Sequence, residues 1–317
     1  MRFVPYQRLD GSPNIIVDGA AGPGTVLTLS HWPKSGTPAS LKRDTSAEIV
    51  FAYLDSPSSH VLADIVSNNH FDEDGLIGIF ILIDPVTAQK HRQLLVDAAS
   101  AGDFGVYQKR DAARIAITIS AYADSETSPL PPEIFALPYP EMCGELYVRL
   151  LGLIPQFLEN LDAYRSHWST EDRKLSVSEE WIEKGRITIE EKNALDLAVV
   201  RMPEDLTACH PYALHSRTPC TRLLIVQAQR VEFQYRYESW VQLASRRPPA
   251  RVDLSDLARD LNQEETSGGL WVFEGVERIT PKLYLEGASK SSVPLATIQQ
   301  RLEAFLSSGR PAWNPYD

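Results

Sequence analysis

Short apolar runs alternate with polar residues along the first part of the chain, and three of the runs end near a side chain that can bind a cation. The runs and the polar residues that follow them are residues 14–17 with Asp18, residues 26–29 with His31, and residues 65–66 with His70. Their length and β-branched content predict buried strands. Active sites of open α/β sheets form at the carboxyl ends of strands, so we expect these side chains to converge there.

Two stretches with helical periodicity accompany these runs. Asp44 or Thr45 can cap a helix that continues to Tyr53. Glu48 lies three residues after Thr45 as in a capping box, and Asp44 is interpreted as the cap. Residues 76–82 suit a second, buried helix. The order strand, strand, helix, strand, helix predicts an α/β fold with a mainly parallel sheet.

The rest of the chain predicts a connector and a second α/β region. Helical periodicity covers residues 87–123 with a break at 101–105, residues 126–141 form a proline-rich connector, and a long amphipathic helix is expected over 146–168. Strands are expected at 186–191, 195–202, 222–227 and 231–241, and helices at 253–262 and 297–306. We therefore expect an α/β metal-binding domain over residues 1–165, which includes a bridging helix. A smaller α/β substrate-binding domain is expected over residues 166–317.

The composition indicates a globular cytoplasmic protein. Of its 317 residues, 43% are hydrophobic, and no apolar run approaches the roughly 20 residues of a membrane span. The first residues lack the apolar centre of a secretory signal. Three scattered cysteines are too few for a disulfide framework, so reduced thiols are expected. No membrane partner is predicted.

One segment opposes the net charge of −11, which argues against a generally basic nucleic-acid surface. Residues 210–251 contain seven arginines but only two glutamates. Arginine suits bidentate contact with phosphate or carboxylate, so four of these residues are predicted to bind substrate: Arg236, Arg246, Arg247 and Arg251. Internal ion pairs and solvated strand faces are the alternative interpretation.

Carboxylates crowd around His70, where Asp72 and Asp74 follow within four residues. Carboxylates beside a core repel one another, so such a cluster usually persists because a cation neutralises it. Mixed nitrogen and oxygen donors suit Mn²⁺ or Mg²⁺. Asp18 and Asp103 are further candidate ligands. The alternative is that Asp72 and Asp74 only cap the following helix.

The remaining motifs give weaker indications of a binding site. The spacing of Cys209, His210, His215 and Cys220 matches no common zinc site. The final ligand position of a calcium EF-hand would fall on Ile83, and the glycine-rich turn at 19–25 lacks the lysine of a P-loop. Four aromatic residues could stack a base, although packing is their more frequent role: Tyr235, Tyr237, Trp240 and Trp271.

The sequence HFDEDG at residues 70–75 resembles the HxDxDG-type motif of the DHH phosphoesterase superfamily, which includes manganese pyrophosphatases, exopolyphosphatases and exonucleases. Residues 29–32 and 44–50 are similar to the family's Asp-His-His loop and the helix after it. Residues 97–114 resemble its later segment with a metal-binding Asp, here Asp103. The motif order implies a circular permutation. Ser30 and Trp32 stand where the family has Asp and a second His, and the family's glycine-histidine cluster is missing.

The resemblance implies a divalent-metal-dependent phosphoester or phosphoanhydride hydrolase that acts on a nucleotide, oligonucleotide or polyphosphate-like substrate. It implies two Mn²⁺ or Mg²⁺ ions held by Asp18, His70, Asp72, Asp74 and Asp103, with His31, His70 and Asp72 in catalysis. The implied partners are a phosphorylated small molecule or a short nucleic acid, and a homodimer is compatible with the sequence. Because of Ser30 and Trp32, a non-catalytic module that binds a nucleotide or a protein stays open as the alternative.

Overall fold

The structure, a computed structural model, describes residues 1–206 and 209–317 and divides into two compact units. Unit 1 comprises Met1–Lys174 together with Gln242–Arg246, and unit 2 comprises Leu175–Val241 together with Arg247–Asp317. The division therefore lies inside helix α8 (Arg165–Glu183) and not at the expected residue 165. We call Gln242–Arg246 the strap, because it belongs to unit 1 although unit 2 flanks it on both sides in the chain.

Unit 1 contains a four-stranded sheet in which every pair is parallel. The strand order is β1 (Arg2–Phe3), β4 (Ile65–Ser67), β2 (Asn14–Val17) and β3 (Thr25–Leu29). All residues of β2 and β4 are buried, as is usual for a parallel sheet with both faces covered. The predicted mixed α/β class is thus confirmed, and the three predicted early strands are present.

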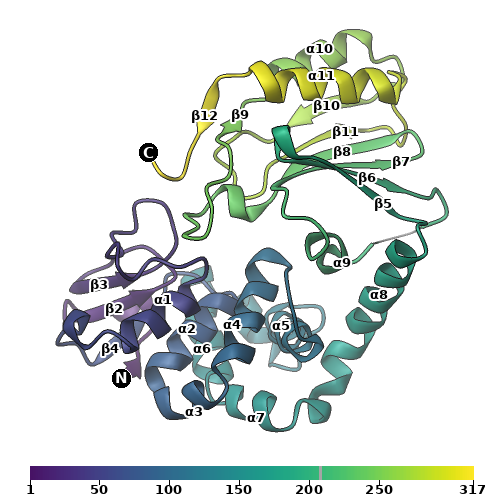
Figure 1. The fold of residues 1–317 in the computed structure, drawn as a ribbon. Coiled ribbons are helices and arrows are strands. Elements are labelled where there is room, and N and C mark those ends of the chain that lie inside the picture. Colours follow the sequence, from purple (N-terminus) through teal and green to yellow (C-terminus); the bar gives the residue numbers. More distant parts are fainter. Residues whose placement is uncertain (207–208) are drawn as a thin grey trace. The chain divides into compact units, whose positions relative to one another are not determined.

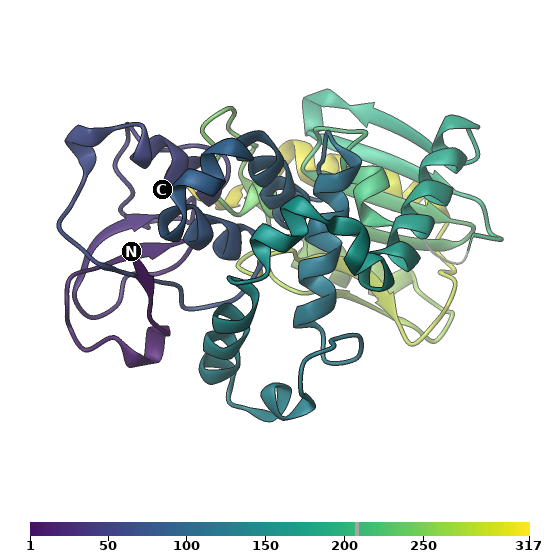
Figure 2. The same cartoon turned by 90° about the horizontal axis from the view of Figure 1, so that it is seen from below.

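The α-helices of unit 1 are α1 (Ser46–Leu54), which precedes β4, and after β4 α2 (Glu73–Ile83), α3 (Pro85–Lys90), α4 (Arg92–Phe104), α5 (Arg110–Ala123), α6 (Tyr139–Leu150), α7 (Ile154–Glu159) and the start of α8. Helix α2 packs against both α1 and α4, and α4 lies beside α5 in both views (Figure 1, Figure 2). The α2 residues Leu76–Leu82 are buried all round, which explains their uninterrupted apolar run.

A short loop brings the ends of β2 and β3 to the same edge of the sheet. Residues 18–24 return the chain to the start of β3, a short path for a parallel pair. Asn14 closes the loop, because its amide donates to the Pro23 carbonyl at 2.6 Å and its Oδ1 accepts from Thr25 Oγ1 at 2.9 Å. Gly24 has a φ of 75°, and a Cβ there would lie 2.4 Å from a backbone carbonyl oxygen, so the position requires glycine.

Three local predictions differ from the structure. Thr45, and not Asp44, is the N-cap of α1, where it forms the capping box with Glu48. Asp103 lies in the last turn of α4, because the helix ends only at Gly105, which has the left-handed conformation of a C-cap. The single helix expected over 146–168 is interrupted between α6 and α7 and again before α8, with Pro155 in the first turn of α7.

Unit 2 contains a six-stranded sheet in the order β10 (Leu270–Phe273), β11 (Lys282–Glu286), β8 (Arg230–Tyr235), β7 (Arg222–Gln227), β6 (Leu197–Met202) and β5 (Thr188–Lys192). Only β6 and β7 pair in parallel. Leu197 and Val199 of β6 pack with helices α10 (Ser255–Glu264) and α11 (Leu295–Ser308), whereas Val200 packs with α8 and α9 (Pro211–His215). The helices consequently cover opposite faces of the sheet (Figure 1).

The remaining elements are short. Strands β9 (Arg251–Val252) and β12 (Pro311–Trp313) form an antiparallel pair in unit 2. Within the described ranges, no helix combines the length and apolar character that crossing a membrane would require.

We expect Thr45→Ala to lower the free energy of unfolding by about 1 kcal/mol, because it removes the hydroxyl that accepts the Glu48 amide at 3.2 Å. Urea unfolding followed by circular dichroism measures the change. The control is Thr170→Ala on the exposed surface of α8, which should change the free energy by less than about 0.5 kcal/mol. Equal effects of the two substitutions would contradict the capping role.

Candidate metal centre

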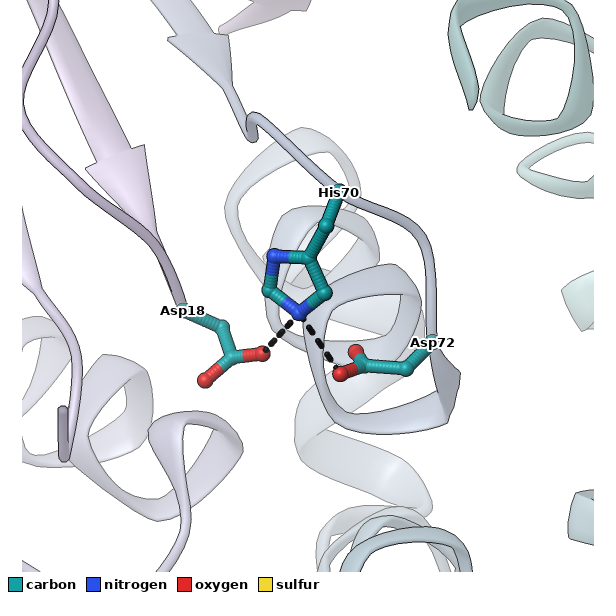
Figure 3. Close-up of side chains that lie close together, drawn as sticks. All are labelled: Asp18, His70 and Asp72. Carbon is teal, nitrogen blue, oxygen red and sulfur yellow. Dashed lines mark hydrogen bonds and ion pairs between the residues drawn. The ribbon is translucent and has the colours of Figure 1, made fainter. Parts of the chain in front are cut away.

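Side chains from three neighbouring parallel strands meet at their carboxyl ends in unit 1. Asp18 directly follows β2, His31 lies two residues after β3, and His70 lies three residues after β4. Figure 3 shows the His70 imidazole between the carboxylates of Asp18 and Asp72, with Asp72 at the start of helix α2. The expected convergence of Asp18, His31 and His70 is therefore confirmed, although 39 positions separate the two histidines in the chain.

Two groups of three residues have ligand atoms close enough to hold a metal ion. Asp18, His70 and Asp72 form the first group, and Asp18, His31 and Asp74 form the second, with all ligand atoms of a group within 4.8 Å of one another. Asp18 belongs to both. Its Oδ2 lies 3.3 Å from His70 Nε2, and its Oδ1 lies 3.4 Å from His31 Nε2. The two oxygens of one carboxylate thus face two imidazoles.

The two groups differ in burial. The side chains of Asp18 and His31 are fully buried, and Asp74 is buried as well, whereas the side chains of His70 and Asp72 are 16% and 26% exposed. Asp103 joins the buried group from the end of α4, with its Oδ2 3.4 Å from His31 Nε2. Solvent therefore reaches the site from the side of His70 and Asp72.

Asp72 and Asp74 both contact the first turns of helices. Asp72 caps its own helix by accepting from the Gly75 amide at 2.8 Å, and its other oxygen contacts His70 Nε2 at 2.7 Å. Asp74 accepts from the amides of Ser46 and Ala47 at 2.6 and 2.7 Å, so it satisfies the start of α1 from the neighbouring helix α2. Asp72 therefore caps the following helix, as the alternative interpretation predicted, whereas Asp74 accepts from α1 instead. Both carboxylates also belong to the metal-competent groups.

The crowding perturbs the ionisation of the cluster. Burial and the charges of neighbouring aspartates raise the pKa of Asp74 and of Asp103 well above the usual range. Burial also disfavours the charged forms of Asp18 and His70. The attraction between these two side chains, and the attraction between Asp72 and His70, outweighs this effect of burial. The pKa of Asp18 falls to about 2, and the pKa of His70 rises to about 11. Without metal, the His70 imidazolium is thus the cation that offsets the carboxylates.

The donor set fits a hard or borderline divalent cation. Within the described residues, the buried Asp103 Oδ2 accepts no hydrogen bond, and the buried Asp18 Oδ2 has an ion pair with His70 but no further donor. Buried acceptors without donors are costly, and a cation bound by both oxygen and imidazole nitrogen would satisfy them. Ligand atoms around Mg²⁺ or Mn²⁺ lie about 3 Å apart, close to the separations between carboxylates and imidazoles here. The cluster could therefore hold a metal ion.

The histidines differ in the partner of the second ring nitrogen. His31 Nδ1 lies 2.6 Å from the carbonyl oxygen of Asp44, whereas the buried His70 Nδ1 has no hydrogen-bond partner among the described residues. The ring of Trp32 packs on His70 with centroids 4.8 Å apart. Ser30 Oγ accepts from the Trp32 amide at 3.1 Å, so it serves the loop after β3.

The four arginines predicted to bind substrate do not form one group. Arg236 and Arg251 are 1% and 0% exposed inside unit 2, where their guanidinium groups donate to backbone carbonyls. Arg236 also pairs with Glu238, and burial lowers the pKa of Arg251 to about 10. Their charge is satisfied internally, so the alternative of internal contacts applies to them. Arg247 of unit 2 lies over the Tyr316 ring, and Arg246 belongs to the strap of unit 1.

The other sequence candidates have structural roles. Tyr235 donates to the Val252 carbonyl in the core of unit 2, and Trp271 Nε1 donates to Glu265. Tyr237 stacks on Trp240, with ring centroids 5.9 Å apart. The two metal-competent groups found among the described residues include none of Cys209, His210, His215 and Cys220, and His210 caps α9.

Three contacts around the site were not predicted from the sequence. Ser46 Oγ donates to Asp18 Oδ1 at 2.7 Å, Glu73 contacts Ser120, and the strap contacts Asp44. Burial raises the pKa of Glu73 to about 7. Ser46 lies directly after the cap of α1, and no local pattern of the sequence places the first turn of that helix near Asp18. No local pattern marks the strap.

If the cluster binds Mn²⁺, Asp18→Asn should abolish binding, because both metal-competent groups contain Asp18. Asp72→Asn affects only the more exposed group and should lower the metal content less than Asp18→Asn does. Equilibrium dialysis with elemental analysis gives the stoichiometry, with the exposed Asp64→Asn as the control. If Asp18→Asn retains the wild-type metal content, Asp18 is not a ligand.

Metal binding should release protons, and its affinity should rise with pH. At pH 7 His70 is protonated because its pKa is about 11, and the raised pKa values of Asp74 and Asp103 favour protonation there too. Ligation requires the deprotonated forms, so lowering the pH makes protons compete with the metal. Calorimetry of Mn²⁺ binding in two buffers of different ionisation enthalpy counts the protons. On binding Mn²⁺, the His70→Gln variant should release about one proton fewer than the wild type. If both proteins release the same number of protons, His70 is excluded as the proton source.

Comparisons with known proteins place the chain in a family without assigning it an activity. A search of curated proteins finds no match. A family model matches residues 1–317, and its description is "Family of unknown function (DUF6687)". The match covers both units and the whole metal-competent cluster, and the chain is a member of this DUF6687 family.

Proposed function

We propose that the protein is a divalent-metal-dependent phosphoester or phosphoanhydride hydrolase, with a divergent and circularly permuted DHH-like arrangement of motifs in unit 1. The observation that carries the proposal is the shared position of Asp18, whose two carboxylate oxygens face His31 and His70. One carboxylate between two nitrogen ligands is suited to hold two ions close together, the arrangement that phosphoryl-transfer hydrolases use.

The candidate ligands would have different roles according to how deeply they are buried. Asp18, His31, Asp74 and Asp103 would form the inner, water-poor part of the centre, and His70 and Asp72 the outer part that substrate reaches. Bound Mn²⁺ or Mg²⁺ would supply charge neutralisation and a lowered pKa of water. Both nitrogens of His31 face neighbouring oxygens in a buried site, so we propose it as a ligand and not as a proton donor to the leaving group.

The substrate we propose is an anion with a phosphoryl group, such as a nucleotide, an oligonucleotide or a polyphosphate. Arg246 is the only one of the four predicted substrate-binding arginines assigned to unit 1, and it is the candidate for phosphate contact. Trp32, which packs on His70, offers an aromatic surface beside the outer ligands.

The competing function is a non-catalytic module that binds a nucleotide or a protein. It is favoured by one observation: Ser30 and Trp32 provide no carboxylate and no imidazole where the DHH superfamily has both. A binding module would retain the fold without the bound metal or without turnover.

With Mn²⁺ present, the protein should hydrolyse at least one member of a panel that contains bis(p-nitrophenyl) phosphate, a dinucleotide and tripolyphosphate. Asp18→Asn and Asp74→Asn should each lower kcat/KM at least about 10³-fold, roughly 4 kcal/mol of transition-state stabilisation. Asp64→Asn should match the wild type. Stoichiometric metal without turnover of any panel member would reject the hydrolase and support the binding module.

A further inference from the structure

The strap contacts the loop that carries His31 through several hydrogen bonds within unit 1. The amide of Gln242 donates to the His31 carbonyl at 2.8 Å, and Lys42 Nζ donates to Gln242 Oε1 at 2.7 Å. The amides of Ala244 and Ser245 both donate to Asp44 Oδ1 at 2.8 Å. The Asp44 carboxylate is therefore fixed by a segment about 200 positions away in the chain.

Ser245 adds a contact to the second oxygen of the same carboxylate. Its hydroxyl donates to Asp44 Oδ2 at 2.5 Å, so three donors of the strap converge on one side chain. Because its carboxylate accepts hydrogen bonds from the strap, Asp44 does not cap α1. The adjacent Thr45 is the N-cap instead. A carboxylate held by three donors holds its own backbone in place, and with it the carbonyl that faces His31.

That carbonyl determines the chemical form of His31. Because a backbone carbonyl can only accept, the 2.6 Å contact between His31 Nδ1 and Asp44 O requires a proton on Nδ1. In the neutral ring, Nε2 then carries the lone pair, and it points at Asp18 and Asp103. Partners of this kind set the tautomer and the orientation of metal-binding imidazoles.

We infer that the strap is a positioning element for the metal centre: through Asp44 it sets the Nδ1–H tautomer and the orientation of His31. Asp44 and Ser245 are positioning residues, because neither belongs to the metal-competent groups. The consequence for metal affinity rests on the proposed function, whereas the effect on the tautomer does not. Both ends of the strap continue into unit 2, so a ligand of the N-terminal cluster depends on a segment from the C-terminal half of the chain.

The test compares Asp44→Ala and Ser245→Ala with two matched controls. Ser128→Ala removes a hydroxyl that also donates within unit 1, to the Tyr122 carbonyl at 2.6 Å. Asp84→Asn alters a capping carboxylate at the start of α3. Asp44→Asn serves as the rescue variant, because its amide oxygen can still accept from the strap amides.

The first measurement is the tautomer of His31 in the metal-free protein, read from the ring ¹⁵N and ¹³Cδ2 shifts at a pH where the ring is neutral. Assignment uses His31→Gln. The wild type, Asp44→Asn and both controls should show the Nδ1–H form, and Asp44→Ala and Ser245→Ala should add the Nε2–H form. An unchanged tautomer in both strap variants would overturn the inference.

The second measurement is the affinity for Mn²⁺ by calorimetry. Asp44→Ala and Ser245→Ala should weaken binding about 10-fold or more without changing the stoichiometry, as loss of the hydrogen-bond partner of a metal-binding histidine does elsewhere. Affinities equal to those of the controls would overturn the positioning role while leaving the metal centre intact. If the wild type binds no Mn²⁺, the proposed function fails, and the tautomer comparison alone decides the role of the strap.

Discussion

The structure of unit 1 depends on how it stabilises several carboxylates at the edge of a parallel sheet. Two like charges about 4 Å apart repel by about 4 kcal/mol at an effective dielectric constant of 20, so three buried aspartates could not coexist without compensation. Asp18 receives it from the His70 imidazolium, and Asp74 receives it from the amides in the first turn of α1. Burial and the charges of neighbouring aspartates also raise the pKa values of Asp74 and Asp103, which disfavours their charged forms. The same carboxylates are the donors that a divalent cation needs.

The backbone amides at the start of a helix connect the fold with the site, because they stabilise one of its carboxylates. The amides of Ser46 and Ala47 at the start of α1 would otherwise lack acceptors, and Asp74 of α2 supplies them. The packing of α1 against α2 therefore has an electrostatic component next to its apolar one. A substitution at Asp74 would remove a candidate ligand and also leave two buried donors without an acceptor, so structural and functional effects overlap at this residue.

Arginine shows the opposite outcome in unit 2. Arg236 and Arg251 belong to an arginine-rich segment that the sequence presents as a basic patch, yet both are buried and donate to carbonyls. A guanidinium carries five donors in a fixed plane, so it can cross-link several loops at once. At these two positions, the positive charge of the segment therefore serves to hold backbone segments of unit 2 together.

Elements with local signals could be predicted from the amino-acid sequence. Two kinds of signal depend on residues within one or two turns of each other: the apolar runs before Asp18, His31 and His70, and the buried helix after Asp74. The convergence of the three polar ends also followed, because parallel strands place their carboxyl ends at one edge. Local sequence did not locate the end of α4 or the interruptions between α6 and α8, where packing and chain direction decide.

The contacts between individual atoms, by contrast, could be read only from the folded structure. Three features depend on distances between segments that are far apart in the chain. They are the contacts of the two Asp18 carboxylate oxygens, the contact of Asp74 with a neighbouring helix and the burial of Arg251. The strap is the clearest case. Nothing in the sequence around Ser245 indicates a partner at Asp44, because a hydrogen bond across about 200 residues leaves no periodic pattern in either segment.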